Sequence, residues 1–413
     1  MKTNPVKGCL DYLPKEMELR QQIIQTILKT YKNNGFLQVK TPILESIENL
    51  TNGDGGDNAK LMFKTIKRGA KLNLNKQNLT ESDLVEEGLR YDLTVPLARL
   101  FTKYKNDLPY PFKSIQIDDS FRAEKPQVGR NRQLTQCDVD VWGVEGNLGE
   151  IEIITTTMEA YYNLGLRNVV CKISDRKILM AIILNAGIEE QKINDVCIVV
   201  DKLDKIGFSG CEAELSEIGI NNNQIQKLIN SLKDIKQNGT KVLTSFGAKE
   251  EDVNNLTTLI EEVLPFLPQT FSIEFDISIV RGQGYYTSSV FEMYYYDSGY
   301  GFAIGGGGRY DKMYGKFSGA EDIPAVGYGI GLDRLVLILS QKENSLIQSK
   351  KLALIYYPTD SINLIMTIKN KYKQNYDVSI FPQPKNFKEF LRKIKLNGFE
   401  LLTKTNKEQI EEI

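Results

Sequence analysis

The sequence predicts an α+β protein with a helical stretch inside it and a small α/β domain near its C-terminal end. Two long runs of strand character, Ser114–Phe121 and Gln133–Val144, enclose a charged segment, as in a hairpin. Between about Asp175 and Pro268 the composition shifts to Lys, Asn, Glu and Leu with helical periodicity, and strand character then returns. The 413 residues are enough for two or three domains with a large buried core.

The first third of the chain predicts a helix, a strand, and a strand that runs into a helix. Apolar residues recur at helical spacing over Lys15–Asn33, and Gly35 ends that helix because glycine readily takes the left-handed conformation found there. A strand follows at Phe36–Leu44, interrupted by Pro42, which cannot donate a ladder hydrogen bond. Leu89–Leu100 then changes from strand to helix character.

Helices and strands alternate beyond the predicted hairpin. Leu148–Leu164 has a helical period, and Ala325–Leu339 is a strand that leads into a helix. Between them, Phe271–Val280 and Tyr285–Tyr296 have strand character. A small α/β domain is expected where strand, helix, strand and helix alternate over Leu352–Tyr357, Ser361–Tyr372, Asp377–Phe381 and Asn386–Asn397.

The composition excludes every mechanism that needs an imidazole from the protein. The chain has no histidine, so a Ser-His-Asp or Cys-His nucleophile system is impossible, as is a zinc site with His ligands. Catalysis is left to carboxylates, Lys, Arg, Tyr, backbone amides and groups of the substrate. The 52 basic and 53 acidic side chains nearly cancel, which argues against non-specific coating of nucleic acid but leaves room for a local basic patch.

Cysteine usage and hydropathy indicate a reduced, intracellular chain. The five cysteines are odd in number and never form a CxxC pair, so we expect no metal site built on them. The apolar stretch around Ile178–Ile183 is too short to span a bilayer, and Met1–Pro14 lacks the apolar core of a secretory signal. We therefore expect a cytoplasmic protein that does not enter a membrane.

The predicted hairpin carries charge in its loop and on one strand. Arg122–Arg132 contains three Arg and one Lys, and guanidinium groups bind phosphate oxygens in a bidentate manner; a solvated hairpin tip is the alternative. The next strand places Gln136, Asp138 and Asp140 on one face. Carboxylates so close repel unless a cation lies between them. That face is either a solvent-facing surface or a seat for an ammonium group or an arginine.

Three further segments combine glycine with arginine. In Val280–Thr287, an arginine, two glycines and paired tyrosines form either a compact polar site or a turn before a hairpin. In Gly305–Asp311, a run of four glycines precedes Arg309; the run matches neither a P-loop nor a Rossmann fingerprint, and predicts a strand beside a nucleotide or a bulged turn. In Ala325–Arg334, small residues lead into a helix. In one interpretation Arg334 reaches the triphosphate of a nucleotide. In the other, the small residues only allow the strand and the helix to pack closely.

In their order along the chain, these segments resemble the class II histidyl-tRNA synthetase family. The similarity runs from Lys7-Gly8 to about Ser340 and continues more weakly to the end. Asp175–Leu179 and Val200–Asp204 are similar to stretches of the family's helical insertion. The segments that carry the resemblance are Arg90–Pro96, Arg122–Asp140, Arg281–Tyr286 and Gly329–Arg334.

The resemblance implies a class II synthetase fold, an antiparallel sheet with flanking helices. It implies a catalytic core at residues 1–174 and 269–340, a helical insertion at 175–268, and a short, anticodon-binding-like α/β domain at 350–413. Gly35–Pro42 is similar to the family's motif 1, which forms a dimer interface, so the resemblance also implies a homodimer.

The implied activity is ATP-dependent activation of L-histidine to histidyl-adenylate, followed by transfer to the 3′ end of tRNA(His). ATP enters as a substrate together with Mg²⁺. The resemblance places Arg122 and Arg281 at the α-phosphate as catalytic residues. The implied ATP-binding residues are Arg122, Glu124, Arg132 and Arg334. The implied histidine-binding residues are Asp92, Thr94, Gln136, Asp140, Tyr285 and Tyr286.

This chemistry suits a chain without histidine. In adenylation the substrate carboxylate attacks the α-phosphorus, so the enzyme supplies positioning and charge neutralisation rather than a base. Two departures leave a second interpretation open: Gln283-Gly284 stand where the family commonly has Leu-Asp, and the C-terminal domain reaches Phe399–Leu402 and then stops after a charged tail. The alternative is a catalytically silent, histidine-sensing paralogue, such as the regulatory subunit of ATP phosphoribosyltransferase. Retention of the arginine set favours the enzyme.

Overall fold

The computed structural model describes two compact units. The described residues are 1–53, 60–281, 284–341 and 350–413. The first unit consists of Met1–Cys9 and Ile24–Ile338. The second unit consists of Leu10–Ile23 and Leu339–Ile413. Helix α1 (Pro14–Asn33) contributes residues to both.

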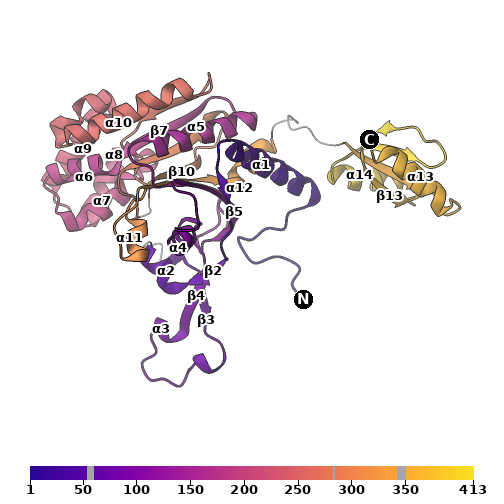
Figure 1. Cartoon of the computed structure of the whole chain (residues 1–413), viewed down its shortest axis with the longest axis horizontal. Coiled ribbons are helices and arrows are strands. Elements are labelled where there is room, and N and C mark those ends of the chain that lie inside the picture. The colour runs from indigo at the N-terminus through magenta and orange to yellow at the C-terminus, as the bar shows by residue number, and fades with distance from the viewer. Residues whose placement is uncertain (54–59, 282–283, 342–349) are drawn as a thin grey trace. The chain divides into compact units, whose positions relative to one another are not determined.

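An eight-stranded sheet forms the centre of the first unit (Figure 1). Neighbouring strands are antiparallel except at the two edges, where β1–β5 and β7–β8 are parallel pairs. The predicted antiparallel sheet with flanking helices is therefore confirmed. In spatial order the strands are β1 (Leu37–Gln38), β5 (Phe112–Phe121), β6 (Gln133–Trp142), β11 (Ala325–Gly331), β10 (Ala303–Arg309), β9 (Ser289–Tyr295), β7 (Val169–Asp175) and β8 (Ser272–Phe275).

The central strand β6 is covered on both faces. Its apolar face is buried, and α5 (Leu148–Asn163) packs against both β6 and β11. The opposite face carries Asp138 and Asp140, which are only 5% and 1% exposed. Beside them, the ring of Phe101 stacks on Trp142 at 4.6 Å in an aromatic core. The acidic face therefore lies in the interior, and its interpretation as a solvent-facing surface was wrong.

The remaining helices and a small sheet complete the core of the first unit. A three-stranded sheet lies beside a buried cluster of Leu50, Met62 and Tyr91. Its strands are β2 (Leu44–Ser46), β4 (Val85–Leu89) and β3 (Lys64–Ile66), and it carries α2 (Ile47–Gly53) and α3 (Glu81–Leu84). Three further helices are α4 (Thr94–Tyr104), α11 (Met313–Ser318) and α12 (Leu332–Leu339).

A helical segment leaves the sheet after β7 and returns to it at β8 (Figure 1). Its first helix begins at Asp175, whose carboxylate accepts hydrogen bonds from the backbone amides of Lys177 and Ile178, an N-cap. The segment, called the helical segment below, consists of α6 (Arg176–Asn185), α7 (Ile193–Val200), α8 (Leu203–Glu217), α9 (Asn222–Asn238) and α10 (Glu250–Val263).

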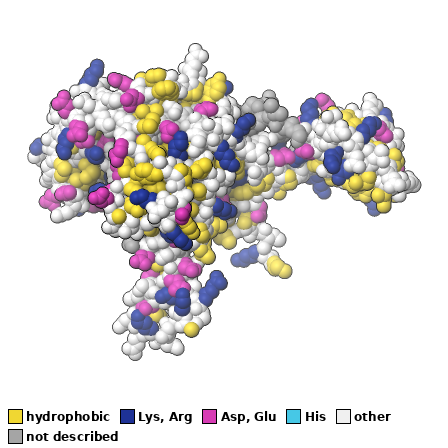
Figure 2. All heavy atoms as spheres, viewed as in Figure 1, with side chains coloured by type: hydrophobic (Ala, Val, Ile, Leu, Met, Phe, Trp, Pro, Cys, Tyr) yellow, Lys and Arg dark blue, Asp and Glu magenta, His cyan; other side chains and the backbone are white. Residues whose placement is uncertain are grey.

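Basic and acidic side chains are interspersed on the face drawn in Figure 2, as the balanced net charge predicts.

The second unit contains a four-stranded sheet with two helices. The predicted alternation of strand, helix, strand and helix is present, and β14 and β15 extend it beyond the predicted elements. β12 lies between β13 and β14 and is parallel to both, whereas β15 is antiparallel to β14. The elements are β12 (Lys351–Tyr356), α13 (Ile362–Tyr372), β13 (Asp377–Pro382), α14 (Phe387–Leu396), β14 (Phe399–Lys404) and β15 (Glu411–Glu412).

Two predicted strands differ from the structure. The strand expected over Phe36–Leu44 is divided, because β1 joins the large sheet and β2 the small one, with Pro42 between them. The strand expected over Phe271–Val280 ends at Phe275. There the Asp276 carboxylate accepts hydrogen bonds from the backbone and hydroxyl of Ser278, which replaces the ladder with a local turn.

Candidate functional site

Two adjoining hollows lie against strands β6, β9, β10 and β11. The inner pocket has a volume of about 20 Å³, room for little more than one water molecule. The outer cavity has a volume of about 690 Å³, within the range of ligand pockets. Arg281 and Gln136 line both, so the two hollows share a wall. The side chains that line the inner pocket are those of Asp92, Thr94, Gln136, Asp138, Asp140, Arg281, Tyr285, Tyr286, Tyr310 and Tyr328.

Three carboxylates converge on the inner pocket. Asp138 and Asp140 project from β6 because alternate residues of a strand share a face. Asp92 precedes α4 and accepts a hydrogen bond from the backbone amide of Val95 at 3.1 Å. Tyr310 donates a hydrogen bond to one oxygen of Asp140. The other Asp140 oxygen is buried and has no hydrogen-bond partner among the described residues. The pocket therefore offers an unused acceptor to a ligand.

The protonation of these acids indicates a site for a cation. Burial, the hydrogen bond from Tyr310 and the charge of Asp92 together set the pKa of Asp140 at about 7, well above its usual value. Burial and the charges of Asp140 and Asp92 also raise the pKa of Asp138 well above its usual range. Burial thus favours the neutral acids. A positively charged ligand favours the carboxylates instead, so its binding is coupled to the release of protons from these acids.

Glycines on β10 and β11 make room for the pocket. A Cβ at Gly327 would lie 3.1 Å from Asp140 Cγ and 3.0 Å from Tyr310 Cε1. A Cβ at Gly306 would lie 2.8 Å from Arg281 Cζ. The run Gly305–Gly308 is therefore part of a strand rather than a bulged turn, and its missing side chains leave space for an arginine.

Arg281 lies between the two hollows in an unusual backbone conformation. Its φ of 62° is in the left-handed region, which is uncommon for a residue other than glycine and concentrates at functional sites. One guanidinium nitrogen pairs with Glu292 at 2.6 Å, and the Tyr294 hydroxyl donates to the other Glu292 oxygen at 2.6 Å. The buried Nε of Arg281 has no hydrogen-bond partner in the described part of the chain. Burial lowers the pKa of Arg281, but Tyr286 and Glu292 more than offset this effect, so the group stays cationic.

The outer cavity is crowded with guanidinium groups. Arg122 donates to the carbonyl of Tyr91 and to the Gln136 side chain, both at 3.1 Å, which fixes it at the border with the inner pocket. Arg334 lies 4.8 Å from the ring of Phe302 and donates to a backbone carbonyl. Burial and the charges of Arg130, Arg281 and Arg122 lower the pKa of Arg334. Such mutual repulsion is relieved by an anion, and phosphate is the anion that arginine forks match best.

The structure brings together ten of the eleven predicted site residues. All six predicted histidine-binding residues line the inner pocket. Arg122, Glu124, Arg281 and Arg334 line the outer cavity. Arg132 lines neither, because its Nε donates to the backbone carbonyl of Glu124 at 3.1 Å and its backbone amide to Gly8. Gln283, one of the two departures from the family pattern, lies outside the described residues.

Sequence reasoning missed several residues of the site. Asp138 was placed on the acidic face but not in the site, although its alternation with Asp140 was the available signal. Tyr310 directly follows the glycine-rich strand, and its bond to Asp140 joins residues 170 positions apart. Glu292 gave no local signal, since its role comes only from its pairing with Arg281.

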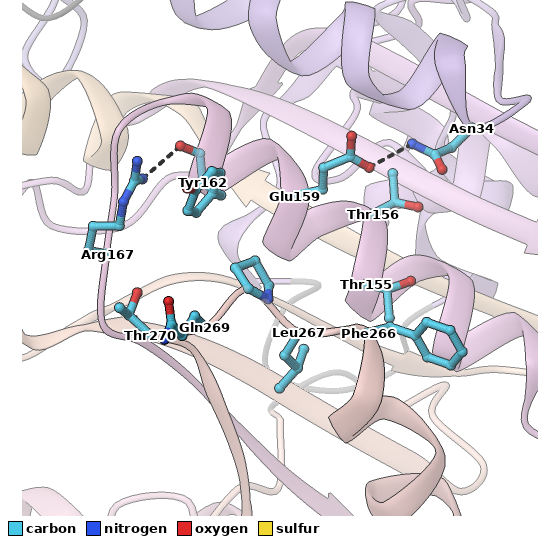
Figure 3. Close-up of a pocket in the computed structure, with 11 residues that line it drawn as sticks. Asn34, Thr155, Thr156, Glu159, Tyr162, Arg167, Phe266, Leu267, Gln269 and Thr270 are labelled. Carbon is cyan, nitrogen blue, oxygen red and sulfur yellow. Dashed lines mark hydrogen bonds between the residues drawn. The ribbon is translucent and has the colours of Figure 1, made fainter.

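A third hollow, of about 650 Å³, lies between α5 and residues 266–270 (Figure 3). Its charged side chains are already engaged: Glu159 accepts from Asn34 at 3.0 Å, and Arg167 donates to the carbonyl of Tyr162 at 2.9 Å. It lacks the convergent, unpaired polar groups of the inner pocket, so we take the two adjoining hollows as the candidate site.

The described residues contain no candidate metal site and no membrane-spanning helix. In the described ranges, no group of three or more Cys, Asp or Glu side chains is arranged to hold a metal ion. No helix within those ranges is long and apolar enough to cross a membrane.

Comparison with known proteins gives a consistent result. The sequence model of the histidyl-tRNA synthetase family matches residues 8–335. The chain is 35% identical over 408 residues to a histidine--tRNA ligase of Leifsonia xyli subsp. xyli, covering 96% of this chain and 93% of that protein. It is 37% identical over 387 residues to a probable histidine--tRNA ligase of Tropheryma whipplei, with coverages of 90% and 88%.

Solved structures show the same fold. A histidyl-tRNA synthetase from Nostoc sp. PCC 7120 superposes with a TM-score of 0.73 at 26% identity, covering 97% of this chain and 91% of that one. A chain from Bacillus halodurans described as an ATP phosphoribosyltransferase regulatory subunit/histidyl-tRNA synthetase also has a TM-score of 0.73, covering 98% and 97%. Its identity of 19% supports the fold alone.

Proposed function

The chain belongs to the histidyl-tRNA synthetase family, and from this premise we propose how its two hollows divide the work of a histidine--tRNA ligase. The enzyme activates L-histidine with ATP and transfers the histidyl group to tRNA. One observation supports this division of roles. The inner pocket is lined by carboxylates that suit a cation, the adjoining outer cavity is lined by arginines that suit an anion, and Arg281 lines both.

Histidine enters at the inner pocket in this proposal, and the side chains that line the pocket move apart to admit it, since the pocket has a volume of only about 20 Å³. Its ammonium group is surrounded by Asp92, Thr94, Gln136 and Asp140, and its imidazole lies against Tyr285 and Tyr286. The raised pKa values of the pocket acids support this assignment, because a bound cation stabilises their charged forms. Recognition of the imidazole by polar side chains also favours histidine over an analogue without ring nitrogens by a factor on the order of 10⁴–10⁵, because such an analogue leaves buried polar groups of the pocket unpaired.

ATP occupies the outer cavity. Arg122 holds the α-phosphate with Arg281 beside it, and Glu124 and Arg334 hold the nucleotide. A histidine carboxylate oxygen forms a bond to the α-phosphorus, the bond to pyrophosphate breaks, and pyrophosphate leaves. No enzyme base is required. The fixed guanidinium groups neutralise charge that grows in the transition state, which is the main contribution such a site makes.

Arg132 and Mg²⁺ have indirect parts in this scheme. Arg132 supports the loop that carries Glu124, through its hydrogen bond to the Glu124 carbonyl. Mg²⁺ would arrive with ATP and would need only one or two carboxylates from the protein. Glu124 is a carboxylate that lines the outer cavity and fits this need.

The remaining assignments follow from the family. We propose that residues 1–174 and 269–340 form the catalytic core, that 175–268 are an insertion, and that 350–413 contact the anticodon of tRNA(His). We also propose a homodimer formed through Gly35–Pro42 and a cytoplasmic location. The regulatory-subunit alternative is not favoured, because curated relatives that are 35% and 37% identical over most of the chain are named histidine--tRNA ligase and probable histidine--tRNA ligase.

Histidine-dependent exchange of pyrophosphate into ATP tests the proposal. The purified, folded protein should catalyse exchange with histidine and with none of the other nineteen amino acids, and should charge tRNA(His) when tRNA is added. Absence of exchange would refute the activity. Exchange with a different amino acid would refute the assignment of the inner pocket, and co-purification with a phosphoribosyltransferase without adenylate formation would restore the regulatory alternative.

A further inference from the structure

The left-handed backbone of Arg281 is held by a residue of the helical segment. The Arg281 amide donates a hydrogen bond to Oδ1 of Asp201 at 3.2 Å, although the two residues are 80 positions apart. The left-handed region is unfavourable for a residue other than glycine, because its Cβ comes too close to the following carbonyl oxygen. Such a conformation persists only where the surrounding structure holds it.

Asp201 is well placed to act as such a restraint. It follows α7 directly, and its own amide donates to the carbonyls of Cys197 and Val199, which ends the helix at this position. Asp201 lines the outer cavity, as does Arg281. The turn that carries Asp201 is thus fixed by α7 and presents one carboxylate oxygen to the active-site backbone.

A second connection anchors the same turn to the sheet. Asp204, at the start of α8, pairs with Lys236 of α9 at 2.6 Å and lies 3.7 Å from Lys172 of β7. Lys172 in turn pairs with Asp276 at 2.7 Å and lies 5.5 Å from the ring of Tyr294. Tyr294 is the residue whose hydroxyl bonds Glu292, the partner of the Arg281 side chain. The helical segment therefore contacts the backbone of Arg281 directly and is connected to its side-chain support through Lys172 and Tyr294.

We propose that Asp201 is a positioning residue for adenylation: its carboxylate holds the Arg281 backbone in the left-handed conformation and so sets the direction of the guanidinium group. This inference rests on the proposed role of Arg281 at the α-phosphate. Without Asp201 the backbone relaxes toward negative φ, and the side chain turns away from the position shared by the two hollows. Asp201 is exposed to solvent, so its replacement leaves no cavity in the core.

The test is pyrophosphate exchange with the full-length chain. Asp201→Ala is expected to lower kcat about tenfold, the effect of losing one charge-assisted hydrogen bond, with the KM for histidine unchanged. Asp201→Asn keeps an oxygen acceptor and is expected to stay within about twofold of the wild type. Asp195→Ala, which removes an exposed acid at the other end of α7, is the matched control and is expected to have no effect.

A double variant separates positioning from a merely structural role. In an Arg281→Ala background, Asp201→Ala should cause no further loss, because both changes act through one side chain. A further tenfold loss there, an Asp201→Ala rate within twofold of the wild type, or an Asn variant as slow as the Ala variant would each overturn the inference. If Arg281→Ala alone leaves exchange unchanged, the proposed function of Arg281 is wrong instead. Should the Ala variant fail to fold, Asp201→Glu, which displaces the carboxylate, is expected to give the same loss of kcat, and a normal rate would refute positioning.

Discussion

Gly306 is the position at which one added methyl group should disturb catalysis most directly. A Cβ there would lie 2.8 Å from Arg281 Cζ and 3.1 Å from Glu292 Cγ, whereas carbon atoms in contact are normally about 3.5–4.0 Å apart. Strand β10 cannot move aside, because Gly306 is paired with Glu292 on one side and Gly329 on the other. The Arg281–Glu292 pair must therefore shift by roughly 1 Å. A displacement of that size costs about 10²-fold in rate.

The assay for Gly306→Ala is histidine-dependent pyrophosphate exchange at saturating substrates, with thermal unfolding measured in parallel. We expect kcat to fall about 10²-fold while the protein stays folded, since alanine in a strand is itself acceptable. Ser272→Ala is the control, because Ser272 is exposed on the edge strand β8 of the same sheet and is not among the residues that line either hollow. A Gly306→Ala rate within about threefold of the control would show that the placement of Arg281 does not limit adenylation.

Three further predictions concern the charges of the site and its support. Arg281→Ala should lower the adenylation rate by roughly 10²–10³, as loss of a preorganised charge partner does, and a rate within a few-fold of wild type contradicts its assignment. Because the pKa of Asp140 is raised from 3.8 to about 7, the folded chain binds one more proton than the unfolded chain between these two pH values. The difference corresponds to about 4 kcal/mol of stability lost as pH rises from 4 to 7. In urea unfolding, Asp140→Asn should have a higher free energy of unfolding than the wild type at pH 8, and this difference should shrink toward pH 4. An equal difference at both pH values would refute the link between the pKa of Asp140 and stability. Glu150→Ala removes the 2.5 Å partner of the partly buried Arg309, which keeps its contact with Asp311 at 3.2 Å, and should cost about 3 kcal/mol in urea unfolding, whereas the exposed Glu145→Ala should be neutral. An equal effect of the two substitutions would show that the buried pair does not stabilise the fold.

The sequence predicted most of the residues that meet at the site, because those residues carry local patterns. The alternation of Gln136, Asp138 and Asp140 placed all three on one face of β6 before any contact was known. The spacing of arginines around Arg122 predicted a phosphate site in the same way. What these patterns left open was whether the acidic face is buried, since that depends on which helices and strands cover it.

The contacts that complete the site were not predictable from local pattern. The bond between Tyr310 and Asp140, and that between Arg281 and Asp201, join residues far apart in the chain. The glycine run had two interpretations until its neighbours were known, because its function is to omit side chains that would meet Arg281. The prediction that the strand continues beyond Phe275 was wrong for a local reason. The Asp276 carboxylate accepts a hydrogen bond from the Ser278 backbone amide, which is therefore not available to a neighbouring strand.

The acidic pocket of a chain without histidine has a practical consequence for spectroscopy. When L-histidine binds, its ring is the only imidazole in the complex. Proton and nitrogen resonances of imidazole then report the tautomer and charge of the substrate directly, with no background from the protein and no need for selective labelling of one residue among many. Because the pKa of Asp140 is raised to about 7, spectra recorded across neutral pH also show whether the substrate ring responds to the charge of that carboxylate.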